Sequence, residues 1–183
     1  MSFMLLGILN SQAAGGGAGA YDLLETTTLT SAASSVTFSG LGSYSDYAHL
    51  QARWTGRNGS AGGAVYMRFN GDTGANYVQH QLYGNGSIAQ SGYNDGQSLL
   101  SWNMADSNTA SNVFTSYVMD ILDFANSNKL TTGRSVYGRT EQPVVAVISH
   151  LWKNTSPVTS IVFLGGPTFA AGSRFSIYGI KAD

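Results

Sequence analysis

Apolar and polar residues alternate along most of this chain, and a two-residue period is typical of β-strands with one buried face. The clearest run covers residues 21–54 and predicts three successive strands separated by short turns. Val36 and Phe38 share one face of the second strand, and Leu50 and Trp54 share one face of the third. We expect both faces to be buried.

The same alternation continues to the last strand of the chain. It predicts further strands at 65–69, 77–83, 144–152, 160–164 and 174–181. Glycine and polar residues predict a turn at 70–76, a mobile loop at 84–98 and a turn at 126–135. The sequence Gly165–Gly166–Pro167 is expected to end the strand before it.

Residues 112–124 fit two patterns. Their apolar positions can form a helical stripe, but they also alternate with polar positions as a strand would. β-branched and aromatic residues favour the strand. The total is nine or ten strands with no confident helix, which predicts an all-β sandwich or barrel.

Residues 1–20 differ from the rest and are expected to form a flexible arm ahead of a β-domain at 21–183. The arm starts with a short apolar run, and its second half is mostly glycine and alanine. A signal peptide is the alternative, although the run lacks a positive start. The run is too short to span a bilayer. The arm residues expected to contact a partner are Phe3, Met4, Leu5, Leu6, Ile8 and Leu9.

Composition narrows the functional classes. Charged residues make up only 10% of the chain, against roughly 25% in an average globular protein. The nine basic residues are scattered and the net charge is −1, which argues against a nucleic-acid partner. The chain has no cysteine, which excludes disulfides and cysteine-based zinc sites. We expect neither a nucleic-acid nor a membrane partner.

The residues that carry chemistry in enzymes show no catalytic pattern. His49, His80 and His150 each stand without a second histidine or a carboxylate at metal-ligand spacing, which favours structural roles. The loop NGDTGAN at 70–76 could offer oxygens to Ca²⁺, but a tight turn explains the same residues. No nucleophile elbow or phosphate-binding loop is present. We expect no catalysis, metal or cofactor.

Tyrosines near polar or loop positions are the remaining candidates for binding. Such rings can anchor a neighbouring subunit or stack on a glycan, and a role in the core or in an interface is the favoured interpretation. The candidates are Tyr44, Tyr66, Tyr83, Tyr93 and Tyr137.

Four stretches together resemble a recurrent module of tailed-bacteriophage virion proteins. They are YDLLETTTLTSAASSVTFSGL (21–41), YAHLQARWTGR (47–57), VYMRFNGDTGANYVQHQLYGNG (65–86) and GSRFSIYGIK (172–181). Their order matches that of the module, and they span nearly the whole predicted domain. Ala52 departs from the pattern, where a larger apolar residue is usual, and this affects packing.

The resemblance implies a jelly-roll-like antiparallel β-sandwich that serves as a non-enzymatic virion part, assembled in the bacterial cytoplasm. Such modules occur as capsid decoration (cement) proteins and as terminal domains of tail fibres or spikes, and they are often homotrimers. A short arm ahead of the sandwich favours decoration, with the major capsid protein as partner. The alternative is a tail component that binds a receptor or carbohydrate.

Overall fold

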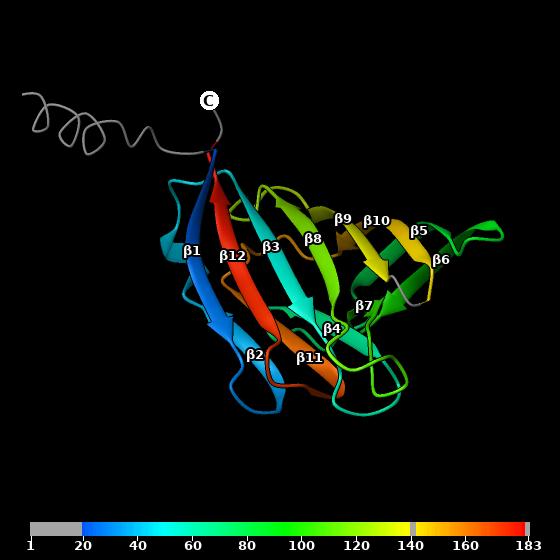
Figure 1. Ribbon diagram of the computed structural model, residues 1–183. Coiled ribbons are helices and arrows are strands. Elements are labelled where there is room, and N and C mark those ends of the chain that lie inside the picture. Colours follow the sequence, from blue (N-terminus) through cyan, green and yellow to red (C-terminus); the bar gives the residue numbers. More distant parts are fainter. Residues whose placement is uncertain (1–19, 140–141, 182–183) are drawn as a thin grey trace, which may run out of the picture.

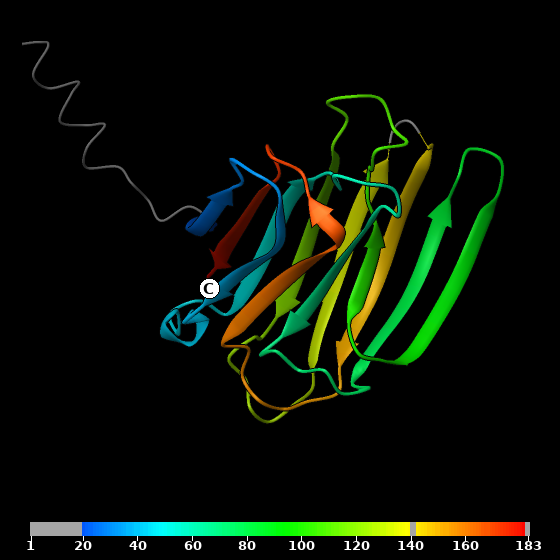
Figure 2. The ribbon, with the colours of Figure 1, turned by 90° about the horizontal axis from the view of Figure 1, so that it is seen from below.

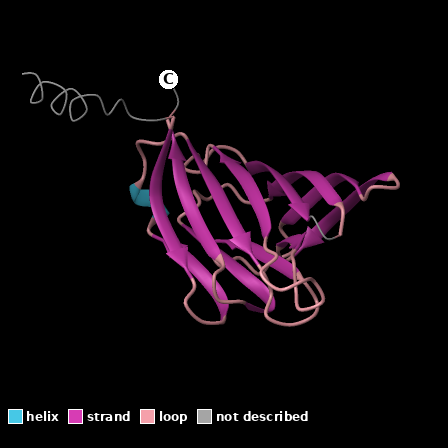
Figure 3. Cartoon of the chain, in the orientation of Figure 1, coloured by secondary structure: helices cyan, strands magenta, loops and turns pink. Residues whose placement is uncertain are grey.

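The computed structural model describes residues 20–139 and 142–181. These residues form two antiparallel β-sheets packed as a sandwich, which confirms the predicted jelly-roll-like all-β fold (Figure 1). Within these ranges, the one helical element is a short 3₁₀ turn, η1, at Leu41–Ser43 (Figure 3). The strands are β1 (Tyr21–Thr28), β2 (Ala33–Ser39), β3 (His49–Gly56), β4 (Ala64–Phe69), β5 (Tyr77–Gly84), β6 (Ala89–Gln97), β7 (Leu100–Asn103), β8 (Thr115–Leu122), β9 (Thr131–Arg139), β10 (Val144–Trp152), β11 (Ser160–Phe169) and β12 (Arg174–Ile180).

The two sheets differ in width. The larger has eight strands in the order β1-β12-β3-β8-β9-β10-β5-β6, and the smaller has four in the order β2-β11-β4-β7. Figure 2 shows the small sheet lying across part of the large one, with the β5–β6 hairpin projecting beyond it. Eight of the nine residues of β6 are exposed, so this edge strand has no buried face.

Three sequence-based expectations were wrong in detail. The described residues form twelve strands, and one of the additional strands, β6, lies in the segment predicted to be a loop. Pairing with β5 stabilises β6, although its sequence lacks an apolar face. The turn predicted at 126–135 is shorter, because β9 already begins at Thr131 and pairs with β8 and β10. The ambiguous segment forms β8, a strand, as its residue types indicated.

Gly165–Gly166–Pro167 does not end its strand. β11 continues to Phe169 across an irregularity in its pairing with β2. A Cβ on Gly165 would come within 2.9 Å of the Phe169 amide nitrogen, so the chain folds closely on itself there. The residues that looked like a terminator therefore form a bulge.

Aromatic rings fill the space between the sheets. Trp54 stacks on Tyr117 with ring centroids 4.6 Å apart and meets Trp102 edge-on at 5.2 Å. Phe163, from the small sheet, lies 5.2 Å from Trp54. The predicted inward faces of β2 and β3 are buried here, including Phe38 and Leu50. The aromatic core therefore lies between the small sheet and the part of the large sheet that it covers.

The 70–76 loop is a structural corner between the sheets. Asn70 and Gly71 both have positive φ, and the Asp72 amide donates to the Phe69 carbonyl, which is the geometry of a type I′ turn. The Asp72 carboxylate accepts hydrogen bonds from Gly74 N, from Asn76 Nδ2 and from Trp152 Nε1. The bonds from the Asn76 and Trp152 side chains hold the pKa of Asp72 below its ordinary value. This turn closes the sandwich, as the tight-turn interpretation predicted.

Two further expectations concern the N-terminal arm and membranes. Residues 1–19, which hold the arm, lie outside the described residues, so the arm remains a prediction. Within the described residues, no helix is long and apolar enough to cross a bilayer.

Candidate functional site

An exposed apolar row crosses the outer face of the large sheet, which the small sheet leaves uncovered. Cross-strand pairing places Leu82 beside Val147, Val147 beside Val136, and Val136 beside Val118. Val145 extends the apolar surface on β10, between Gly84 and Gly138 of the neighbouring strands. These five side chains, here called the valine row, are 41–63% exposed. Contiguous exposed apolar surface of this kind marks sites of protein contact.

The charged groups beside the valine row are paired within the sheet. Arg134 Nε lies 2.9 Å from Asp120 Oδ2, and Gln51 Nε2 donates to Asp120 Oδ1 at 2.6 Å. Arg53 donates to Gln51 and stacks over the rings of Tyr21 and Tyr178, 5.0 and 4.3 Å from their centroids. A neighbour that covered the row would therefore meet charges that already have partners, which lowers the cost of removing water.

A polar cavity lies on the other face of the large sheet, where the small sheet ends at β7. Its volume is about 260 Å³. The β5–β6 hairpin forms one wall and β4, β7 and β9 form the others. The described residues that line it are Ala64, Tyr66, Gln79, Gln81, Asn94, Ser101, Trp102, Asn103 and Tyr137, here called the amide cleft.

Gln79 builds the floor of the amide cleft. Its Nε2 donates to the Ser101 carbonyl at 3.0 Å, and its Oε1 accepts from the Ser101 amide at 2.9 Å. The side chain thus makes the two backbone hydrogen bonds that a neighbouring strand would make, and it occupies the edge of β7 at Ser101. Gln79 Nε2 also lies 3.5 Å from His150 Nδ1, which connects the cleft to the core.

His150 and Ser135 form a buried pair behind the amide cleft. Ser135 Oγ lies 2.7 Å from His150 Nε2, a separation found in nucleophile–base pairs. However, Ser135 is only 2% exposed, and its Oγ already accepts from Trp102 Nε1 at 2.9 Å. Burial lowers the pKa of His150 to about 3, so the ring is a weak base at neutral pH. We interpret the pair as a structural link between the sheets.

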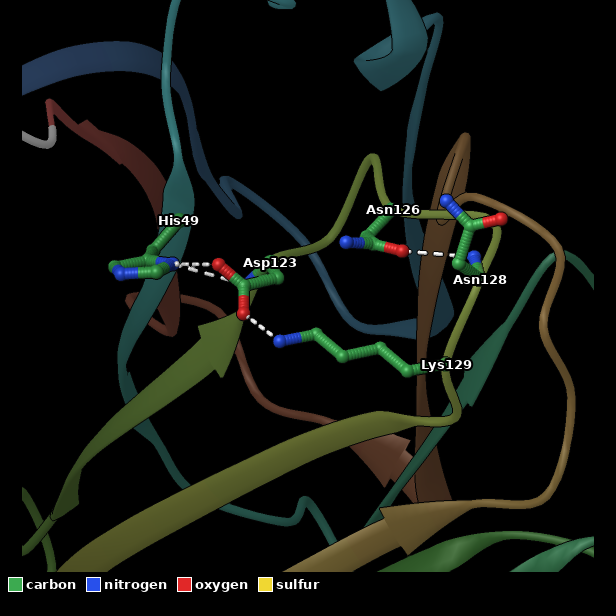
Figure 4. A network of polar contacts seen from close by, with 5 residues as sticks. All are labelled: His49, Asp123, Asn126, Asn128 and Lys129. Atoms are coloured by element: carbon green, nitrogen blue, oxygen red, sulfur yellow. Dashed lines mark hydrogen bonds and ion pairs between the residues drawn. The ribbon is translucent and has the colours of Figure 1, made fainter.

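His49 has an acidic neighbour that its sequence position did not reveal. Its Nδ1 accepts from the Asp123 amide at 2.9 Å and lies 3.2 Å from Asp123 Oδ1 (Figure 4). Lys129 pairs with the other Asp123 oxygen, and that ammonium lowers the pKa of the carboxyl. Asp123 has φ +49°, so the cluster holds the chain in a left-handed turn after β8. Within the described residues, no group of three histidine or acidic side chains could hold a metal ion.

The five candidate tyrosines separate into two sets. Tyr66 and Tyr137 line the amide cleft, and Tyr83 lies on the same face of β5 as Gln81 and donates to Gln90. Burial raises the pKa of Tyr137, so its hydroxyl stays neutral.

The other two tyrosines lie elsewhere. The Tyr44 hydroxyl donates to Glu25 at 3.4 Å near η1, and Tyr93 is 64% exposed on the outer face of β6. The arm residues Phe3 to Leu9 lie outside the described residues. Sequence reasoning missed the amide side chains Gln81 and Asn94. The signal that could have found them is the spacing of polar residues by two along both β5 and β6.

Comparison with known proteins adds little. No family model matches the chain, and no curated protein matches it. Among solved structures, an exo-inulinase from Aspergillus awamori matches with a TM-score of 0.33 and 8% identity. The match covers 88% of this chain but only 29% of that one. A likeness this weak carries no argument about function.

Proposed function

We propose that this chain is a non-enzymatic structural protein of a bacteriophage virion, a decoration protein that binds the head lattice as a homotrimer. The valine row is the observation that carries the proposal. A protein that works alone in water has little reason to expose five adjacent aliphatic side chains on a flat sheet, whereas a subunit of an assembly buries them. The resemblance of the sequence to phage virion modules supplies the setting.

The valine row is assigned to the contact between copies of this chain. The row is continuous across four neighbouring strands, and the ion pair beside it is neutralised within the sheet, so a second copy that covered the row would meet no unpaired charge from that pair. The predicted apolar arm at residues 3–9 is then left to engage the major capsid protein. A trimer would present three arms at once, which converts a weak contact into tight attachment.

Replacing valines of the row by lysine tests the contact between copies. The variant Val136→Lys/Val147→Lys should run as a monomer in size-exclusion chromatography with light scattering, because each ammonium would lose its water in the interface. Thr132→Lys is the matched control, since Thr132 lies on the same face of β9 outside the row. A wild-type protein that is monomeric at every concentration would contradict the assignment.

The capsid role is tested separately by counting copies of the protein in purified virions by quantitative mass spectrometry. Hundreds of copies per particle are expected of a decoration protein, and a handful would place the protein in the tail instead. Removal of residues 1–20 should leave a folded domain that no longer binds heads. Binding that survives this truncation would contradict the role of the arm.

A tail component that binds a receptor is the second candidate function, and the amide cleft is the observation that favours it. Particles without the protein would then fail to adsorb to host cells. Particles without a decoration protein should adsorb normally but lose resistance to heat.

A further inference from the structure

We propose that the amide cleft binds a single residue of a neutral saccharide. This inference does not depend on whether the protein belongs to the head or the tail. It rests on the shape of the cleft, on the amide and phenol groups that point to it, and on the absence of charge among its described lining residues.

The size of the cleft matches one sugar ring. Its volume of about 260 Å³ lies just below the roughly 300–1,000 Å³ of pockets that hold drug-sized ligands. The cleft opens along the inner face of the β5–β6 hairpin, where Tyr83 and Gln90 continue the wall. A glycan could therefore place one ring in the cleft and extend along the projecting hairpin (Figure 2).

The hydrogen-bonding groups of the cleft fall into fixed and available sets. Gln79 is occupied by the backbone of Ser101 and by His150, and Asn103 Nδ2 lies 3.5 Å from the Tyr137 hydroxyl. Within the described part of the chain, no hydrogen bond engages the side chains of Gln81, Asn94 or Tyr66. An amide offers donors and an acceptor on one rigid plane, which suits the adjacent hydroxyls of a sugar.

Gly92 makes room for the available amide of Gln81. The two residues face each other across β5 and β6, and a Cβ on Gly92 would come within 2.9 Å of Gln81 Nε2. The Gln81 side chain therefore lies over the Cα of Gly92. Gly92 thus leaves the space in which the Gln81 amide sits at the cleft wall.

The chemistry of the wall favours an uncharged, hydroxyl-rich ligand. The described lining residues include aromatic, amide and hydroxyl groups but no acid or base. Aromatic rings present a negative face to the weakly positive C–H groups of a sugar. A peptide that added a strand to β7 would have to displace Gln79 from Ser101, so the closed edge argues against that ligand.

The test is a glycan array probed with the full-length protein, carrying neutral hexose oligosaccharides beside uronic, sialylated and sulfated ones. Tryptophan fluorescence, to which Trp102 in the cleft wall contributes, then gives Kd for the best neutral oligosaccharide. A value of about 10 μM to 1 mM is expected for so small a contact. Binding confined to acidic glycans, or none by about 5 mM neutral sugar, would overturn the proposal.

Two variants locate the site. Gln81→Ala removes the amide and Gly92→Ala displaces it, and both should weaken binding at least tenfold, about the effect of losing one good hydrogen bond to a buried ligand group. Tyr93→Ala, on the opposite face of the same hairpin, should bind as the wild type does. Each variant must keep the wild-type circular dichroism spectrum and Tm. Full affinity in both cleft variants would place the ligand elsewhere and end the proposal.

Discussion

The two ends of the large sheet differ in one respect, which is whether the small sheet lies across them. Around β3 and β8 the small sheet covers the inner face, and Trp54, Tyr117 and Trp102 pack into a continuous aromatic core. The β5–β6 hairpin projects beyond the small sheet, and β6 is exposed to solvent on both faces. The covered end fixes the fold, and the uncovered end is free to carry polar groups that suit a ligand.

A substitution in the covered end should give the largest loss of stability. Trp54→Ala would leave a cavity against Tyr117 and Phe163 and should lower the free energy of unfolding by about 3–5 kcal/mol in urea denaturation. Trp54 Nε1 has no hydrogen-bond partner among the described residues, so the expected loss is one of packing. Trp54→Phe should therefore cost clearly less. Equal losses in the two variants would show that the indole stabilises the fold by an interaction other than filling space.

The pH dependence of stability probes the boundary between the two ends, where His150 lies. Its folded-state pKa of about 3 is below the ordinary value of 6.5, so the unfolded chain binds a proton that the folded chain does not. Stability should fall as pH falls below 6.5, by about 2 kcal/mol between about pH 8 and about pH 5. In the His150→Gln variant, the free energy of unfolding should not show this decrease between about pH 8 and about pH 5.

If the His150→Gln variant does not fold, the protonation of His150 can be followed directly in the wild-type protein. The ring proton signals of His150 in the NMR spectrum of the wild type should stay constant from about pH 8 to about pH 5. A midpoint near 6.5 would show that the ring is accessible to water, and the link between the sheets would then be open in solution.

The smallest effect is expected at the uncovered end. Tyr93→Ala removes a large ring that lies in water on the outer face of β6, with its nearest aromatic neighbour, His80, at 6.1 Å. The free energy of unfolding should change by less than about 0.5 kcal/mol. A loss above about 1 kcal/mol would show that the hairpin is covered in the free protein, for instance by a second copy.

The sequence predicted the covered end well, because burial on one face produces alternation that can be counted. β2 and β3 both have the predicted inward faces, with Phe38 and Leu50 buried. β6, at the uncovered end, escaped prediction for the opposite reason, although its partner β5 was predicted. β6 has no apolar face, so only its pairing with β5 makes it a strand, and pairing is a tertiary property.

The candidate sites show the same limit. Tyrosine was a useful guide, since Tyr66 and Tyr137 do meet in one cleft. The residues that give the cleft its chemistry, Gln81 and Asn94, are unremarkable in a sequence rich in polar residues. The valine row was hidden because Val136 and Val147 alternate with residues that are buried, and the sequence alone does not say which face of a strand is covered.

The pairing of β1 with β12 has a consequence for how the chain could be rearranged. Tyr21 pairs with Ile180, so the first and last strands start and finish at one corner, with Cα atoms about 5 Å apart. A few added residues could join position 181 to position 21, and new ends could be opened in the turn at Asn85–Ser87 between β5 and β6. Every strand pair would survive this circular permutation. The order in which the strands are synthesised is therefore separable from the order in which they pack.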